Sequence, residues 1–232
     1  PAFTQADAVP WFGNVMASRW GFEALAVDLA RNNAYDKTLM PWEDRLHQAA
    51  WRQDFWLAEL RKVGGQDLLV SELSYAQDEL SRWEGSPFAW PFEMLSQPDW
   101  DVVKDVYNNH YQAAFRARNK VRAGLADTGD LVSLKGNHHN DELWSWVLQD
   151  DRMERVLGVE GILVQKSGPI HRLDARSEAF DSTMYTPFKK LGGTMVPTLV
   201  FNVLALMGMA ALVWAGLLMQ PRISGLLKSP QA

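Results

Sequence analysis

The best candidates for metal ligands in this sequence are two adjacent histidines. His138 and His139 lie in the run KGNHHNDE, directly before Asn140 and two carboxylates. Zinc sites take three or four ligands, and adjacent side chains diverge on a helix or strand. Both histidines could therefore bind one ion only from a loop and with a distant third ligand, which makes them weak metal candidates. The run otherwise predicts solvated histidines before a helix that Asn140 caps and that extends to Leu157.

The other polar residues follow no catalytic pattern. The chain has no cysteine, no Gly-x-Ser-x-Gly sequence, no Walker loop and no dinucleotide-binding glycine motif. The carboxylate pair Asp150 and Asp151 fits a solvated helix surface. Residues 1–190 hold 28 acidic and 21 basic side chains, a net charge of −7, and an acidic surface repels phosphate. We therefore predict no catalytic residue, no cofactor on this chain and no nucleic-acid partner.

A charged pair interrupts the first apolar segment of the chain. Arg19 and Glu23 lie four apart within residues 10–31, which are otherwise apolar on most helical faces. Pro10 and Gly13 leave this segment too short to span a bilayer. It is either a core helix or a re-entrant or interfacial helix that dips into a membrane and returns.

The segment from Leu191 to Pro221 carries no charge over thirty-one residues, and from Pro197 to Met219 only Thr198 and Asn202 are polar. A helix rises about 1.5 Å per residue, so this stretch reaches about 35 Å, against about 30 Å for the hydrocarbon core of a bilayer. The pattern predicts one transmembrane helix. The alternative is a buried helix of a large soluble protein.

The residues between these two segments predict further helices. Pro41 is expected to open one helix, residues 67–83 to form another, and Asp99 to start a long one. The short β-branched run at 161–165 is the clearest strand candidate. The predicted fold class is mainly α: a helical domain with at most a short strand or two, plus one C-terminal transmembrane helix.

Three separated stretches carry a family resemblance. They are MASRWGFEALAVDLARNNAYDK at residues 16–37, LKGNHHNDEL at 134–143 with GILVQKSGPIH at 161–171, and TPFKKLGGTMVPTLVFNVLALMGMAALVWAGLL at 186–218. Together they resemble bacterial ABC exporter permeases of the white/ABCG type. In that family the first stretch belongs to a re-entrant helical hairpin at the outer membrane face, the second to a large extracytoplasmic insert, and the third to the last membrane helix.

The resemblance implies that the chain is the C-terminal part of a larger ATP-driven permease of the bacterial cytoplasmic (inner) membrane. Residues 1–35 would form the re-entrant or interfacial hairpin, 36–190 a helical extracytoplasmic domain, 191–220 the transmembrane helix and 221–232 a cytoplasmic tail. ATP and Mg²⁺ would bind an ATP-binding cassette domain outside this fragment. The implied partners are membrane lipid, a second permease half in a homo- or heterodimer and that cassette domain, and whether a periplasmic protein also docks on the external domain stays open.

The resemblance also implies roles for particular residues. The hairpin would form the outer gate for a hydrophobic or amphipathic substrate through Arg19, Trp20, Phe22 and Glu23. Because unpaired charges at membrane depth are costly, we expect Arg19 and Glu23 to pair with each other or with neighbouring chain ends. The C-terminal helix would present Phe201, Asn202 and Leu206 either to the substrate path or to a neighbouring helix.

Two other functions stay open at this point. One is a membrane-anchored helical scaffold that binds a periplasmic protein through its Trp-rich surface, without transport. The other is a membrane-tethered metal hydrolase, for which the only support is the pair His138 and His139.

Overall fold

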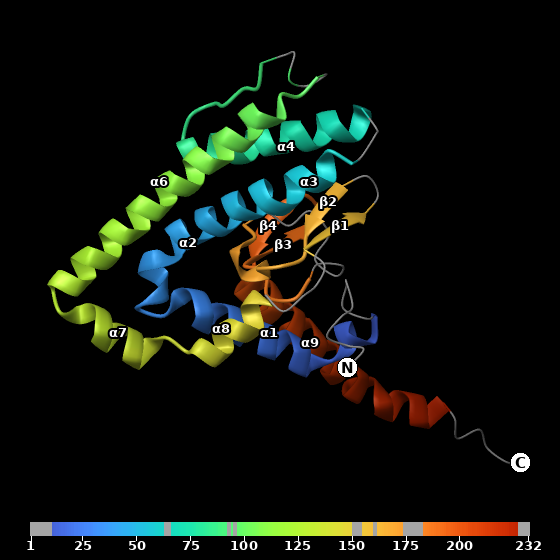
Figure 1. The fold of residues 1–232 in the computed structure, drawn as a ribbon. Helices are drawn as coiled ribbons and strands as arrows, with labels where there is room; N and C mark the ends of the chain where they lie inside the picture. The colour runs from blue at the N-terminus through green and yellow to red at the C-terminus, as the bar shows by residue number, and fades with distance from the viewer. Residues whose placement is uncertain are drawn as a thin grey trace, which may run out of the picture.

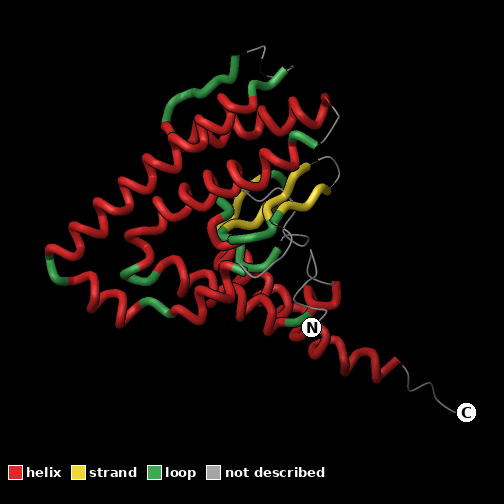
Figure 2. The backbone as a smooth tube through the Cα atoms, in the orientation of Figure 1, coloured by secondary structure: helices red, strands yellow, loops and turns green. Residues whose placement is uncertain are grey.

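The computed structural model of the chain describes residues 11–62, 66–91, 94, 97–149, 155–159, 162–173 and 183–226. Helices dominate these residues, and the strands are few and short (Figure 2). The predicted mainly α fold is thus confirmed. Predictions made for residues 1–10, 64–65, 150–151, 161 and 227–232 lie outside the described residues.

The described part of the chain starts with a short 3-10 helix, η2 (Trp11–Val15), followed by α1 (Ala17–Asn32) and α2 (Asp36–Trp51). Asn33 separates the two longer helices, because its Oδ1 accepts hydrogen bonds from the N–H groups of Tyr35 and Asp36 at 3.0 and 2.8 Å. The predicted helix start at Pro41 is wrong: α2 begins five residues earlier and carries Pro41 inside it. The helix loses one backbone hydrogen bond there, since proline has no N–H.

The main core lies where α2 continues through the π-helical turn η3 (Arg52–Trp56) into α3 (Leu57–Leu60). There α4 (Gln66–Glu84) and α6 (Trp100–Asp127) pack against it (Figure 1). The helices predicted over 67–83 and after Asp99 are confirmed, and the Asp99 carboxylate accepts hydrogen bonds from the first N–H groups of α6. Fully buried side chains of this core include Trp56, Leu60, Leu73, Leu80, Val103 and Tyr107.

Two short helices, α7 (Asp130–His138) and α8 (Asp141–Leu148), lead from the far end of α6 back to α1 (Figure 1). Asn140 caps α8 as predicted, with its Oδ1 accepting from the N–H of Leu143 at 3.0 Å. The predicted extension of this helix to Leu157 is wrong. The helix ends at Leu148, where Gln149 adopts a left-handed conformation with φ of 51°.

The strands form two antiparallel hairpins. β1 (Val156–Val159) pairs with β2 (Ile162–Gln165), and β3 (Phe188–Leu191) pairs with β4 (Thr194–Pro197). Gly192 and Gly193 make the second turn with φ of 55° and 86°, the backbone region that a tight hairpin turn needs and that favours glycine. The described residues thus hold four short strands where one or two were expected. A short 3-10 helix, η4 (Pro169–His171), follows β2.

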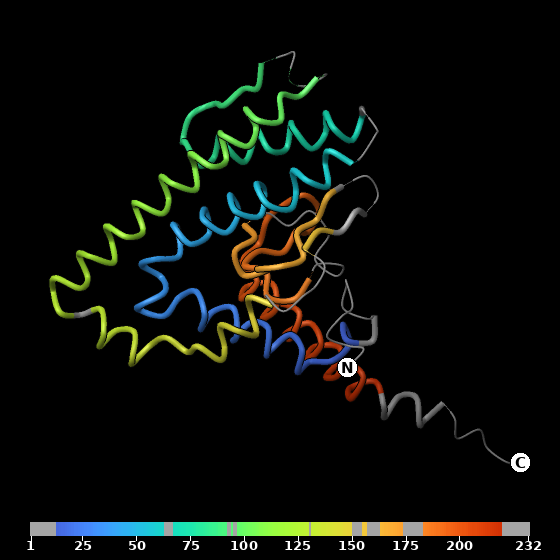
Figure 3. Tube along the Cα trace, in the orientation of Figure 1, coloured from blue at the N-terminus to red at the C-terminus, as the bar shows by residue number. Residues whose placement is uncertain are grey.

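The last helix, α9 (Thr198–Leu226), begins directly after β4 and extends away from the body of the molecule (Figures 1 and 3). Residues 191–197, expected to belong to a membrane helix, instead complete the β3–β4 hairpin. Among the described residues, Thr198–Met219 is the one stretch of helix that is long and apolar enough to cross a membrane. Most of its side chains beyond Asn202 are exposed, so the body does not bury this helix as a soluble core would.

Candidate functional site: the junction of α1 and α9

The two apolar segments of the sequence lie side by side, because α1 packs along the first half of α9. Trp20 and Phe201 form the centre of this contact, with ring centroids 5.7 Å apart. Leu206 packs against the same pair and is partly buried. The residues predicted separately in the hairpin and in the last helix are therefore neighbours, and Phe201 and Leu206 face α1.

Glu23 is fully buried and accepts hydrogen bonds from three other residues at the junction. Its Oε1 accepts hydrogen bonds from Lys189 Nζ at 2.6 Å and from the N–H of Tyr185 at 3.1 Å. Its Oε2 accepts from Asn202 Nδ2 at 3.2 Å. The same Asn202 nitrogen donates to the backbone oxygen of Trp20 at 3.1 Å, so one amide links α9 to both a side chain and the backbone of α1.

Arg19 is near Glu23 but is not its main partner. Its Nη2 lies 4.0 Å from Glu23 Oε2, beyond hydrogen-bond distance. The guanidinium instead stacks over the Trp20 ring at 4.0 Å, and Nη1 donates to Asn14 Oδ1. Its Nε and Nη2 are buried and have no hydrogen-bond partner within the described residues. The expected Arg19–Glu23 pair is thus present only as a long ion pair.

Lys189 is the functional residue that sequence reasoning missed. It lies 166 residues from Glu23 and is also fully buried, on β3 just before α9. Burial lowers the pKa of Lys189, while the Glu23 carboxylate opposes this shift. Its neighbour Lys190 is partly exposed, which is the alternation expected along a strand with one buried face. Because both residues are lysines, the sequence contains no local signal for which of the two is buried.

The opposite face of α1 is apolar and exposed. Phe22 is 45% exposed and lies near the rings of Trp146 and Tyr185, with centroid distances of 6.3 and 6.4 Å. Large exposed apolar side chains continue along and before the helix at Val15, Met16, Leu25 and Leu29. Arg19 and Glu23 are thus buried toward α9 while large apolar side chains face outward, and Asp28 is a partly exposed charge on the same helix.

The side chains of the adjacent residues His138 and His139 lie in different environments. His138 is exposed, whereas His139 is mostly buried, with Nδ1 2.9 Å from Asp36 Oδ2 and Nε2 3.1 Å from Asp141 Oδ1. The expectation that both are solvated is therefore wrong for His139, which joins α8 to the start of α2. No group of three or more potential metal ligands occurs in the part of the chain that the structure describes.

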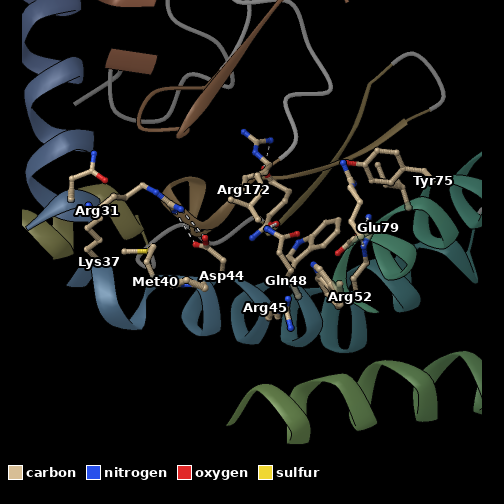
Figure 4. Close-up of a pocket in the computed structure, with 18 residues that line it drawn as sticks. Arg31, Lys37, Met40, Asp44, Arg45, Gln48, Arg52, Tyr75, Glu79 and Arg172 are labelled. Carbon is tan, nitrogen blue, oxygen red and sulfur yellow. Dashed lines mark hydrogen bonds and ion pairs between the residues drawn. The ribbon is translucent and has the colours of Figure 1, made fainter. Parts of the chain in front are cut away.

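A second polar site, which the sequence did not indicate, is a cavity of about 630 Å³ between α2, α4, β2 and the residues after η4 (Figure 4). One face of α2 supplies much of its lining, including Lys37, Asp44 and Gln48, and Arg52 follows at the start of η3. The lining residues are scattered between positions 31 and 173, so no local motif marks the cavity. Comparison of the chain with protein-family models, with curated proteins and with solved structures finds no match.

Proposed function

We propose that this chain is the membrane-spanning and extracytoplasmic part of an ATP-driven ABC exporter permease of the bacterial inner membrane. In this proposal α1 and α9 form the outer gate for a hydrophobic or amphipathic substrate. The chain itself is no enzyme, and ATP with Mg²⁺ is bound and hydrolysed by a cassette domain elsewhere in the full protein. A second permease half completes the substrate path.

The observation that carries the proposal is the buried set of polar contacts between α1 and the start of α9. Lipid tails are as apolar as leucine, so the hydrophobic effect alone does not hold two helices together inside a membrane. Interhelical hydrogen bonds and ion pairs do. Glu23 on α1 receives one such bond from Asn202, which is one of only two polar residues in the apolar part of α9. It receives a second, charged bond from Lys189 on β3, in the hairpin that leads into α9. A short helix tied in this way moves with the membrane helix it contacts.

The exposed side chains agree with a location at membrane depth. Both α1 and α9 present apolar groups outward, at Leu25 and Leu29 on one helix and at Leu204 and Met207 on the other. Such a surface is stable against lipid or against the second permease half. The acidic residues 36–190 would then stand outside the membrane, as the resemblance implies.

Dye transport by the full-length protein tests the proposal. Inverted membrane vesicles that hold it should take up a fluorescent amphipathic dye only when ATP is added. Glu23→Ala should abolish most of this uptake, whereas Asp28→Ala, a partly exposed carboxylate on the same helix, should retain it. Dye uptake that is independent of ATP, or full transport by Glu23→Ala at unchanged protein abundance, would overturn the proposal.

A further inference from the structure

The cavity between α2 and α4 is basic although the chain is acidic. The whole chain carries a net charge of −5. Among the residues that the structure describes, six cationic side chains and two carboxylates line the cavity, a difference of four positive charges. The cations are Arg31, Lys37, Arg45, Arg52, Arg82 and Arg172. A concave surface that gathers charge opposite to the rest of the protein attracts and concentrates ligands of the other sign, here anions.

The two carboxylates are already taken by two of the cations. Asp44 accepts from Arg31 through both oxygens, at 2.9 and 2.7 Å. Glu79 Oε2 accepts from Arg52 Nε at 2.8 Å and from Nη2 at 2.5 Å. Figure 4 shows these pairs on opposite sides of the cavity, with Arg172 between them on the facing wall. Two of the other cations, Lys37 and Arg45, form no ion pair with a described carboxylate, and these two are the surplus cations of the lining.

The floor of the cavity is a buried polar layer. Gln48 Nε2 donates to Gln165 Oε1 at 3.0 Å and to the backbone oxygen of His171 at 3.1 Å, which fixes both amides. Arg52 is 2% exposed, and its Nη1 makes no hydrogen bond within the described residues, lying 3.9 Å from Glu72 Oε2. Most buried donors in proteins have a hydrogen-bond partner, so this nitrogen remains able to donate to a ligand in the cavity.

The other parts of the lining are apolar and aromatic. Trp51 and Trp83 contribute rings, and Met40 and Leu163 contribute aliphatic surface. Flat apolar groups stack well on indole rings and beneath guanidinium groups. The cavity volume lies within the range of about 300–1,000 Å³ that is usual for small-molecule sites.

We propose that this cavity binds a small water-soluble organic anion, in which a carboxylate or phosphate is joined to a flat apolar body. The surplus cations hold the anionic group, and the tryptophans and aliphatic side chains hold the body. This inference does not depend on transport, so it stands or falls separately from the exporter proposal.

Isothermal titration calorimetry of the full chain in zwitterionic lipid nanodiscs provides the first test, with empty nanodiscs subtracted. The probes are naphthalene-1-acetate and naphthalene-1-acetamide, which share an apolar body and differ in charge. We expect saturable binding of the acetate with a Kd at least tenfold lower than that of the acetamide. Equal affinities, or no saturable binding of the acetate, would overturn the proposal.

Two double variants test where on the chain the anion binds. Lys37→Gln/Arg45→Gln removes two cations from the α2 face of the lining, and neither residue forms an ion pair with a described carboxylate. It should weaken acetate binding at least tenfold. Lys120→Gln/Arg122→Gln makes the same change on the exposed surface of α6 and should shift the Kd less than twofold. Equal losses in the two double variants would place the anion elsewhere and contradict the proposal.

A further experiment with an anionic lipid tests whether the bound anion is a soluble molecule or a lipid headgroup. Nanodiscs that contain phosphatidylglycerol should leave the Kd of naphthalene-1-acetate unchanged, because a soluble ligand reaches the cavity without competition from the bilayer. Loss of acetate binding in these nanodiscs would show that a lipid anion occupies the cavity, and the assignment of a soluble ligand would then be wrong.

Discussion

The α1–α9 junction and the α2–α4 cavity both bury charged side chains, yet they satisfy them differently. At the junction, the chain itself supplies every partner of Glu23, and none of the junction residues lines the cavity. At the cavity, two ion pairs fix the walls, while Lys37 and Arg45 form no ion pair with a described carboxylate. Buried charges cost free energy unless they are paired. The partners of Glu23 therefore indicate a structural lock, and the two Arg19 donors that lack a described partner are not part of it. At the cavity, the cations that pair with no described carboxylate indicate a place for a ligand.

The largest expected effect comes from breaking the junction. Lys189→Met leaves the Glu23 carboxylate buried without its cation, which typically costs about 3–5 kcal/mol. We expect this loss as much faster amide hydrogen exchange throughout α1, measured on the full chain in nanodiscs. The matched control is Lys190→Met, which removes a partly exposed charge from the same strand and should leave exchange in α1 unchanged.

The double variant Glu23→Gln/Lys189→Met sharpens this test. It removes both charges and keeps an amide that can still bond to Asn202, so it should recover most of the protection that Lys189→Met loses. If the double variant exchanges as fast as the single one, the ion pair is not what holds α1 to α9.

A smaller effect is expected at the wall of the cavity. Arg31→Met removes a two-bond pair with Asp44, but Asp44 Oδ1 keeps its contact with His171 Nδ1 at 2.9 Å. We therefore expect a loss of about 2 kcal/mol in the free energy of unfolding, measured by urea denaturation with tryptophan fluorescence. Arg45→Met, on the same lining, should cost less than about 0.5 kcal/mol because no described carboxylate pairs with it. Equal losses of unfolding free energy in Arg31→Met and Arg45→Met would contradict the distinction between a cation that is paired with a carboxylate and one that is not.

The smallest effect is a pH dependence beside the cavity. Burial, together with His171 and Arg118, lowers the pKa of His47 from 6.5 to about 3, and the His47 and His171 rings stack at 3.9 Å. The unfolded chain therefore binds a proton near pH 6.5 that the folded chain does not. This contribution to stability is full above pH 6.5 and falls as the pH drops toward 3.

His47→Gln should flatten this part of the stability curve between pH 6.5 and 5, by about 1 kcal/mol per pH unit. Urea denaturation at several pH values measures it. His138→Gln, at an exposed histidine, is the control and should leave the curve as in the parent chain. An unchanged slope in His47→Gln would show that His47 titrates normally.

The sequence predicted the parts of the junction but not the way they join. Arg19, Glu23 and Asn202 stood out because polar residues are rare within apolar segments. Lys189 did not, because a lysine in a polar stretch is usually solvated, and only the β3–β4 hairpin places it against Glu23. We expected Glu23 to pair with Arg19 or with neighbouring chain ends, but its partners are Lys189 on β3 and Asn202 on α9, and Arg19 lies only at the distance of a long ion pair.

Two helix boundaries were predicted wrongly because contacts outside the local pattern determine them. Local pattern could not show that the helix after Asn140 ends at Leu148, because its end depends on Gln149 in a left-handed conformation and on β1 pairing with β2. Pro41 suggested a helix start because proline favours first turns, but the side chain of Asn33 starts the helix earlier. The cavity has no local pattern at all, since its lining comes from four separate segments.

We propose that α9 crosses the membrane with the helical body outside, and cysteine labelling tests this proposal most directly because the chain has no cysteine. Ser74→Cys lies on the exposed surface of α4, and Ser229→Cys lies in the C-terminal tail. In intact cells a membrane-impermeant maleimide should label Ser74→Cys, whereas Ser229→Cys should react only after the membrane is permeabilised. Labelling of both positions from the same side would contradict the account.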